Sequence, residues 1–405
     1  MISKKVKFKE MYLEDSRNGI YKTKEFHGSG IKIVNMGELF KFDYIKNQEM
    51  ELIELTDDEK NKFCLESGDL LFARRSVVAD GAGKCSYVDN CEELTFESSI
   101  IRVRLNKDVC NSKYYYYYFK SPYGKGKILS ISSGVSVKGI KGSDLKELEI
   151  DYVPITSQNK IVDILSKYDD LIENNLKRIK LLEETAELIY KEWFVNFRFP
   201  GYEKCEFADG MPREWEIFKV KDFGDVITGK TPSTQKAEYY GDEIPFIKTP
   251  DMSNGIYVLK TKQSLSEAGA KSQENKFIPR NTILVSCIGT LGVVALAKEL
   301  SQFNQQINAV VCNKKEYIHY LYFKFKSLKE YLEALGSNGS TMGNVNKNKF
   351  ENIEILKPND KLLEKYNNFS EPIFKEILNL QLSNEKLKEA RDILIPRLIM
   401  GEIEV

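Results

Sequence analysis

Residues 157–194 read SQNKIVDILSKYDDLIENNLKRIKLLEETAELIYKEWF, and this stretch predicts one long amphipathic helix. Every seventh residue from Leu165 to Trp193 is apolar, and a second row with the same spacing runs from Tyr168 to Ile189. Such a heptad pattern, kept over about four heptads with Lys and Glu on its flanks, is typical of a helix that pairs with another helix. At 1.5 Å per residue the helix would be roughly 55 Å long. Its apolar side therefore needs a partner.

A second copy of this helix follows later in the chain. The residues from Leu182 to Ala186 correspond to those from Leu387 to Arg391, 205 residues further on. The same shift carries residues 133–150 onto 338–355, and a shift of 207 carries residues 96–100 onto 303–307. A repeat of about two hundred residues has the size of a domain. The chain therefore contains two copies of a globular module followed by a long helix.

The two helices are expected to pair with each other as an antiparallel coiled coil. Both leave their modules in the same direction, so an internal pseudo-two-fold symmetry sets the pair antiparallel and the modules at opposite ends. Asn175 and Asn384 interrupt the apolar rows and would fix the register or the orientation of the pair. The predicted interface consists of Leu165, Ile172, Asn175, Ile179, Leu182 and Ile189 in the first helix and Ile377, Leu380, Asn384, Leu387 and Leu394 in the second. The alternative is that each helix packs on its own module as ordinary core.

The modules themselves are predicted to be α+β. Short strand-like runs at 31–34, 69–73 and 100–105 are separated by Gly, Asn and Asp. Residues 114–119 could be strand or helix, but their counterpart at 318–324 continues into good helix formers at 329–335, which favours helix. The predicted division is 1–154 for the first module, 155–200 for the first long helix with a linker, 201–357 for the second module and 358–405 for the second long helix.

The composition is that of an ordinary soluble protein with reduced thiols. The 405 residues include 30% charged and 42% hydrophobic residues with zero formal net charge, so no global basic field points to nucleic acid. No apolar stretch is long enough to cross a membrane and no signal sequence begins the chain, so a cytoplasmic location is expected. The seven cysteines lack C-x-x-C spacing and the two histidines, His27 and His319, stand alone. We therefore expect no disulfide framework and no metal site.

One catalytic motif matches the sequence and is rejected. Residues 224–231 (GDVITGKT) fit the phosphate-binding pattern G-x-x-x-x-G-K-[ST]. That pattern needs a helix that begins at the Lys and Thr, but Pro232 disfavours helical geometry at Thr231. The preceding run at 216–221 has the alternation of a half-exposed strand rather than of a buried parallel strand. No methyltransferase loop or nuclease-like acidic cluster is present, so the chain is predicted to be a binding protein without catalytic residues.

Several segments resemble the target-recognition domain of type I restriction-modification specificity (S) subunits. Residues 227–233 (ITGKTPS) and 238–248 (EYYGDEIPFIK) are similar to the opening of that domain, and 278–286, 289–292 and 304–306 continue the likeness. Residues 181–195 and 387–403 resemble the two conserved helices of the family. The first module departs from the pattern, since it has NGIYK at 18–22 and FARRS at 72–76 instead of the Thr-Pro-Ser box.

The resemblance implies a non-catalytic DNA-recognition subunit. Each module would read one half of a split double-stranded DNA target, and the helix pair would hold the modules apart. Two modification (methyltransferase) subunits would dock beside the helices, and restriction (translocase-nuclease) subunits would join for cleavage. S-adenosylmethionine, ATP and magnesium would then belong to the partner subunits, with no cofactor bound by this chain. Two alternatives stay open: a coiled-coil scaffold whose modules bind proteins, and an NTP-binding enzyme that uses residues 224–231.

The candidate DNA contacts are loop residues that can form bidentate or phosphate hydrogen bonds. In the first module Arg74 and Arg75 suit guanine or phosphate, whereas Lys138 and Lys141 suit the phosphate backbone. In the second module the candidates are Lys230, Thr231, Ser233, Lys248, Asn344, Lys347 and Lys349. Residues 304–306 (NQQ) are expected either to contact DNA or to be structural polar residues of a strand.

Inserting one heptad into both long helices should lengthen the non-specific gap in the DNA target, because the helix length would set the separation of the modules. The methylated sequence of the variant complex measures this gap. An unchanged gap would show that the helices are not the spacer.

Overall fold

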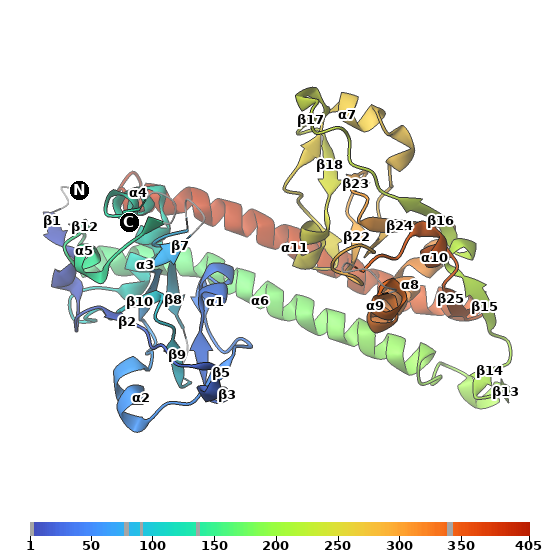
Figure 1. The fold of residues 1–405 in the computed structure, drawn as a ribbon, viewed down its shortest axis with the longest axis horizontal. Coiled ribbons are helices and arrows are strands. Elements are labelled where there is room, and N and C mark those ends of the chain that lie inside the picture. The colour runs from blue at the N-terminus through green and yellow to red at the C-terminus, as the bar shows by residue number, and fades with distance from the viewer. Residues whose placement is uncertain (1–3, 77–80, 90–91, 135–137, 338–342) are drawn as a thin grey trace. The chain divides into compact units, whose positions relative to one another are not determined.

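The computed structural model describes residues 4–76, 81–89, 92–134, 138–337 and 343–405 (Figure 1). The parts of the repeat at 135–137 and 338–342 lie outside the described residues. The chain forms two compact units, a first unit of Met1–Ile172 with Lys386–Val405 and a second unit of Glu173–Glu385. Each unit combines one module with about half of each long helix.

The first module is built on a five-stranded sheet with the order β2-β10-β6-β8-β4. Its strands are β2 (Arg17–Asn18), β10 (Ile100–Val103), β6 (Leu70–Ala73), β8 (Cys85–Val88) and β4 (Tyr44–Ile45). A second sheet contains β5 (Leu52–Ile53), β3 (His27–Val34) and β9 (Leu94–Phe96), and smaller pairs join β1 (Lys4–Lys7) to β12 (Glu149–Tyr152) and β7 (Arg75–Ser76) to β11 (Lys138–Gly139). The central strand β6 is completely buried, as the uninterrupted apolar run at 70–73 requires.

Five short helices complete this module. They are α1 (Met36–Lys41), α2 (Asp57–Phe63), α3 (Ser112–Lys120), α4 (Pro122–Ser130) and α5 (Gly142–Lys146). Residues 114–119 are helical in α3, as predicted, and all six are buried. The chain turns between α3 and α4 because the backbone of Ser121 is extended. The Ser121 side chain accepts a hydrogen bond from the Gly124 N–H and so caps α4. Pro122 follows at the first position of the helix, where proline is tolerated.

The second module repeats the five-stranded sheet, while its smaller sheet has four strands instead of three. Its five-stranded sheet has the order β16 (Gly224–Thr228), β24 (Ile307–Cys312), β21 (Ile283–Ser286), β22 (Val294–Ala297) and β19 (Tyr257–Val258). The other strands are β15 (Glu216–Lys219) with β25 (Glu354–Lys357), and β17 (Tyr240–Gly241), β20 (Ser264–Leu265), β18 (Ile244–Ile247) and β23 (Gln302–Phe303). Its helices are α7 (Glu267–Lys271), α8 (Ile318–Ser327), α9 (Lys329–Gly336) and α10 (Lys347–Glu351), and a small hairpin of β13 (Phe207–Ala208) and β14 (Met211–Pro212) precedes it. The predicted domain-sized repeat is thus a repeat of fold.

The two long helices are α6 (Ile155–Phe194) and α11 (Asp360–Ile399), each of 40 residues. In each unit one part of α6, green in Figure 1, lies beside one part of α11, red. Within the second unit the Asn175 amide donates to Asn384 Oδ1 at 2.9 Å, while the Trp193 ring lies 5.9 Å from that of Tyr366. Partner numbers fall along α11 as they rise along α6, so the pair is antiparallel. No helix among the described residues is long and apolar enough to cross a membrane.

The predicted interface residues lie at or beside the buried side of this pair. Leu165, Ile172, Asn175, Ile179, Ile377, Leu380 and Asn384 are buried, whereas Leu182, Ile189, Leu387 and Leu394 are half-buried. Packing on the module occurs as well, since Leu165 of α6 and Ile395 of α11 share one hydrophobic core with the tyrosines of α3. In the second unit Ala186 and Ile377 share a core with Tyr322 of α8. Each module therefore packs against both helices, so the two alternatives weighed from the sequence are not exclusive.

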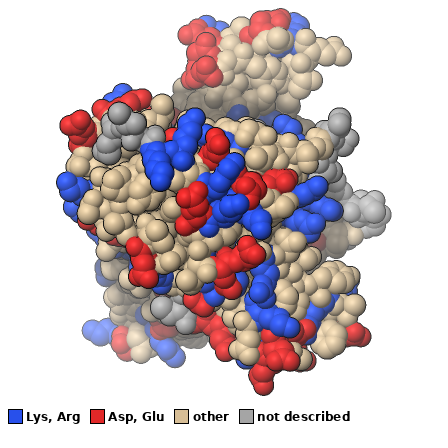
Figure 2. Space-filling view, turned by 90° about the vertical axis from the view of Figure 1, so that its left-hand side faces the viewer, with Lys and Arg blue, Asp and Glu red and all other residues tan. Residues whose placement is uncertain are grey.

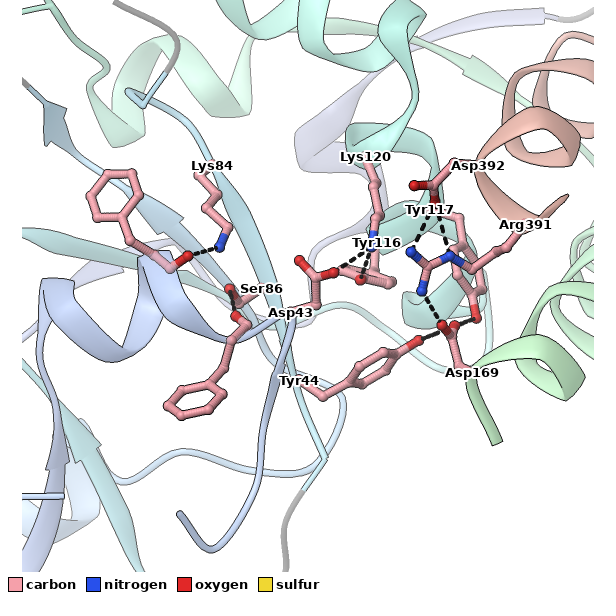
Figure 3. A network of polar contacts seen from close by, with 12 residues as sticks. Asp43, Tyr44, Lys84, Ser86, Tyr116, Tyr117, Lys120, Asp169, Arg391 and Asp392 are labelled. Carbon is pink, nitrogen blue, oxygen red and sulfur yellow. Dashed lines mark hydrogen bonds and ion pairs between the residues drawn. The ribbon is translucent and has the colours of Figure 1, made fainter. Parts of the chain in front are cut away.

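A buried polar cluster fastens the first module to its helices (Figure 3). Asp169 of α6 accepts hydrogen bonds from the hydroxyls of Tyr44, at 2.6 Å, and Tyr117, and it pairs with Arg391 of α11. Both charged side chains are 8% exposed. Burial opposes the charge of Arg391, but attraction and hydrogen bonding to Asp169 raise its pKa above the ordinary value. We call Tyr44, Tyr117, Asp169 and Arg391 the Asp169 cluster.

The corresponding contact in the second unit is apolar. The 205-residue shift places Phe374 at the position of Asp169, and it places Ala186 at the position of Arg391. Phe374 and Ala186 are buried, and the Tyr322 ring meets the Phe374 ring edge to face at 5.5 Å. The two halves of the chain thus solve the same packing problem with a charged pair in one and an aromatic contact in the other.

Replacing Asp169 by Asn should destabilise the first unit by about 3–5 kcal/mol, because it leaves the buried Arg391 without its counter-charge. The double change Asp169→Phe with Arg391→Ala copies the residues of the second unit and should recover most of that loss. Amide hydrogen exchange of α3 peptides in the full chain reports the stability of this unit. A double variant as unstable as the sum of its single variants would contradict this account.

Candidate nucleic-acid interface

Four predicted basic residues of the first module lie together on one small ladder. Strand β7 pairs antiparallel with β11, so that Arg75 lies opposite Gly139 and Ser76 opposite Lys138. The Ile140 N–H donates to the carbonyl of Arg74 at 3.0 Å, and Lys141 follows at the start of α5. We call β7 and β11 with the flanking Arg74 and Lys141 the Arg75 ladder.

The cations of the Arg75 ladder have no acidic partner among the described residues. None of Arg74, Arg75, Lys138 and Lys141 forms an ion pair with another residue in the described part of the chain, and Arg75 and Lys141 are exposed. A Cβ at Gly139 would lie 3.1 Å from Arg74 O, so a glycine at this position suits the close approach of the two strands. Unpaired guanidinium and ammonium groups at a strand end are suited to phosphate oxygens and guanine edges.

Charge elsewhere on the molecule is mixed. On the face shown in Figure 2, Lys and Arg side chains are interspersed with Asp and Glu rather than gathered into one basic field. This agrees with the zero formal net charge. Any attraction to DNA must therefore come from local groups such as the Arg75 ladder, not from the overall field of the protein.

The second module carries different residues at the same place. Ile288 bridges to Asn344 as Arg75 does to Gly139, and the Val345 N–H donates to Cys287 O at 2.8 Å as Ile140 does to Arg74. Cys287 and Ile288 thus stand where the first module has Arg74 and Arg75. The two cations are replaced by a buried thiol and an apolar side chain, while the backbone pairing is kept.

The lysines that follow Asn344 are partly committed to structure. Lys347 begins α10, and its ammonium lies 3.9 Å from Glu351. The ammonium of Lys349 donates to the carbonyl of Leu335 in α9 at 3.1 Å. Asn344 itself is exposed. Of these three predicted contacts, Asn344 and Lys347 are the more available to a ligand.

Lys230 and Thr231 lie in a second place, beside the turn at 304–306, and Ser233 is an exposed residue further along the same loop. The Lys230 N–H donates to Phe303 O at 3.0 Å, and the Thr231 hydroxyl donates to Gln305 Oε1 at 2.6 Å. Gly229 packs directly on this turn, because a Cβ there would lie 2.1 Å from Asn304 O. On the other side of the turn, the Cys287 N–H donates to Gln306 O at 2.7 Å. Residues 304–306 therefore lie between the Thr231 loop and the Ile288–Asn344 bridge.

Lys248 belongs to the same neighbourhood. It follows β18, whose last residue Ile247 accepts a hydrogen bond from the Asn304 N–H at 3.0 Å. Its own N–H donates to Asp251 Oδ2 at 2.9 Å, and its ammonium lies 5.8 Å from the centre of the Phe246 ring. Loops of the second module that are far apart in sequence thus converge on residues 304–306.

The three polar residues of that turn have different roles. Asn304 is buried; it donates to Gln306 Oε1 at 2.9 Å and accepts from the Gln306 N–H, so it holds the turn. Gln305 is exposed and faces Thr231. Residues 304–306 lie between β23 and β24, so the expectation that they belong to a strand was wrong. Gln305 is a candidate contact in its own right.

Tyr21 is a candidate that sequence reasoning missed. The N–H groups of Gly19 and Ile20 donate to Ile100 O and Phe96 O, just as those of Gly229 and Lys230 donate to Ile307 O and Phe303 O. Tyr21 therefore occupies the position of Thr231, and its side chain is 79% exposed. Aligning the glycines would have found it, because neither Gly19 nor Gly229 has room for a Cβ.

The phosphate-binding pattern at 224–231 does not form a phosphate site. Residues Gly224–Thr228 are an edge strand, and no α-helix begins at Lys230 or Thr231. Both histidines have local partners: His27 with Glu51, and His319 with Ser370. Burial lowers the pKa of His319 to about 4. Across the described ranges, no three His, Cys, Asp or Glu side chains are grouped to hold a metal ion.

Comparisons with known proteins match this architecture. Residues 4–184 and 212–370 match the family described as type I restriction modification DNA specificity domain. The specificity subunit of type I restriction enzyme HindI from Haemophilus influenzae is 27% identical, over 98% of this chain and 99% of that protein. The MjaIX specificity subunit of Methanocaldococcus jannaschii is also 27% identical, over 95% and 89%.

A solved structure shares the fold. The crystal structure of a type I restriction-modification S subunit from M. genitalium has a TM-score of 0.55 and 16% identity, over 98% of this chain and 95% of that one. The two segments that match the family each span one module and part of the long helix that follows it. The chain therefore belongs to the type I restriction modification DNA specificity domain family.

Proposed function

We propose that this chain is the non-catalytic DNA-specificity subunit of a type I restriction-modification complex, and that each module binds one half of a split DNA target. The observation that carries the proposal is a scaffold that repeats while its loop residues diverge. Arg74 and Arg75 of the first module occupy the positions that Cys287 and Ile288 occupy in the second. Two modules of one fold with different contact chemistry suit two half-sites of different sequence.

The contacts divide by chemistry. In the first module Arg75 and Tyr21 are placed to reach base edges, and Lys138 and Lys141 to bind phosphates. In the second module Thr231 and Gln305 present an exposed hydroxyl–amide pair that suits adenine or other polar base edges. Lys230 and Lys248 would supply phosphate contacts there, with Ser233, Asn344, Lys347 and the more committed Lys349 around them.

Partner subunits would use the outer sides of the long helices. Relatives of this chain are named specificity subunits of restriction enzymes, which implies assembly with other subunits. On α6, Leu171, Leu176, Leu181 and Leu188 are each more than half exposed, although the buried side of the helix is already paired. Of these, Leu181 and Leu188 are seven residues apart and lie on the same side of the helix, and an exposed apolar side suits a protein contact. We place two modification subunits here, with restriction subunits joining them in the cytoplasm and with S-adenosylmethionine, ATP and magnesium bound by the partners.

A selection from random DNA duplexes by the chain with its cognate modification subunit tests the function. A consensus of two short blocks separated by a fixed gap is expected. The scaffold alternative predicts protein partners but no such consensus, and its absence would overturn the proposal. The NTP-binding alternative has lost its support, because no helix follows β16 to hold phosphates.

Arg75→Ala should relax specificity at one base pair of one half-site, at a cost of about 1–3 kcal/mol for the wild-type base. Lys141→Ala should instead weaken binding to all DNA sequences alike. It should also reduce the magnitude of the slope of log affinity against log salt concentration by about one. Lys62→Ala, on the exposed side of α2, is the matched control. Binding titrations at several salt concentrations distinguish them. Identical behaviour of all three variants would contradict the assignment of the Arg75 ladder.

Tyr21→Ala should leave folding within about 0.5 kcal/mol of the wild type, because the side chain is largely exposed. The same change should weaken binding to the half-site of the first module while the other half-site keeps its selectivity. Duplexes with substitutions in one half-site at a time give the readout. Loss of selectivity in both half-sites would argue against a local base contact.

A further inference from the structure

The first module contains a cavity of about 440 Å³ between α1, the segment 81–85, the end of α3 and the helix α4. Phe40, Phe119 and Ile128 form much of its apolar wall. The volume lies in the range of sites that enclose small organic molecules. The cavity lining that the structure describes includes no residue of the Arg75 ladder, although a Cβ at Gly83 would lie 2.0 Å from Ile128 Cγ2 in the cavity wall and 3.7 Å from Ile140 Cδ1 beside the ladder.

A single residue difference between the modules accounts for part of this space. Gly83 and Gly292 have φ of +78° and +76°, and their N–H groups donate to the last residues of the equivalent strands β6 and β21. The residues just before them, Ala82 and Leu291, are therefore equivalent. Leu291 is buried against glycines of the second module: a Cβ at Gly336 or Gly343 would lie 2.7 Å from its Cδ1. Ala82 lines the cavity and contributes only a methyl group.

The polar lining is cationic. Among the described residues that line the cavity, Lys84, Lys120 and Lys125 face one carboxylate, that of Asp43. Asp43 pairs with Lys120, and the Lys84 ammonium donates to Phe40 O at 2.5 Å (Figure 3). Neither Lys84 nor Lys125 has an ion pair with any described residue. Burial lowers the pKa of Lys84, and the two neighbouring lysines lower it further against the opposing effect of Asp43.

We propose that this cavity binds a small organic anion with an apolar body, such as an aromatic carboxylate. The apolar part would lie against Phe40, Phe119 and Ile128, and the anionic group would pair with Lys84 and Lys125. An uncharged apolar molecule would leave the excess positive charge uncompensated, and inorganic phosphate would leave the apolar wall wet. The match of both surfaces selects an amphipathic anion.

Because of where the cavity lies, a bound ligand could affect the contact between the first module and the long helices. Asp43 lies at its edge and directly precedes Tyr44, whose hydroxyl donates to Asp169 of α6. Lys120, the partner of Asp43, also hydrogen-bonds to the Tyr116 hydroxyl in α3. A bound anion that breaks the ion pair between Lys120 and Asp43 would change the contacts of the residue next to Tyr44. Tyr44 belongs to the Asp169 cluster, which holds the first module on the long helices (Figure 3).

The test uses the full chain and 8-anilinonaphthalene-1-sulfonate, an aromatic body with one sulfonate whose fluorescence rises in apolar sites. We expect saturable binding of one dye in the wild type and at least tenfold weaker binding in Ala82→Leu, which copies the second module. Lys84→Gln with Lys125→Gln should weaken binding and reduce its salt dependence, whereas Lys62→Gln should not. Leu291→Ala controls for a general effect of changing packing at this position.

Circular dichroism and thermal unfolding of each variant check that the fold is kept. If Ala82→Leu does not fold, the paired lysine variant decides, since its changes lie at the rim. Equal affinity for N-phenyl-1-naphthylamine, which lacks the sulfonate, would overturn the proposal. So would unchanged dye binding in both the Ala82→Leu and the paired lysine variants. Displacement of the dye by random-sequence duplex DNA would also overturn it, because the cavity would then belong to the DNA interface.

Discussion

Each long helix has an apolar side that water would solvate poorly, and the antiparallel contact between α6 and α11, together with the packing of the modules on both helices, removes that side from water. The register is specified by more than hydrophobicity. The buried amides of Asn175 and Asn384 satisfy each other at 2.9 Å, and a shift by one heptad would leave both without a partner at a cost of about 1–3 kcal/mol each. Because each unit contains parts of both α6 and α11, each module meets both helices, and the first unit joins residues from the two ends of the chain, Met1–Ile172 and Lys386–Val405.

The two units hold this arrangement by different chemistry. The first fixes its module through a buried Asp169–Arg391 pair with two tyrosine hydroxyls, whereas the second places Phe374 and Ala186 at those positions. A buried charged pair is strongly directional, but losing one member destabilises the fold because the other charge is left buried without a partner. An aromatic contact leaves no unpaired charge when one side chain is replaced. The modules differ at the loops as well, where Ala82 lines a cavity in the first module and the equivalent Leu291 is buried against Gly336 and Gly343 in the second. Duplication preserved backbone pairing, and side chains diverged wherever the pairing did not need them.

Much of this architecture could be predicted from the sequence. The heptad rows gave both helices, the repeat gave the shared module, and residues 114–119 were correctly predicted to be helical. The candidate nucleic-acid interface was predicted less completely, because it depends on pairing between loops that are far apart in the sequence. Nothing local shows that Arg75 pairs with Gly139, that Thr231 donates to Gln305, or that Lys349 is engaged by Leu335 O. Tyr21 was overlooked because the register between the modules drifts with loop length, and the backbone hydrogen bonds shared by Gly19 and Gly229 identify it as the counterpart of Thr231.

The central claim is that two independent modules on one repeated scaffold each specify one half of a target. The most direct measurement is the consensus selected from random duplexes by a chain in which the first module replaces the second between the same helix ends, assayed with the cognate modification subunit. The account predicts a palindromic target whose two halves both match the half-site of the first module, separated by the wild-type gap. An asymmetric consensus that keeps the half-site of the removed module would contradict it.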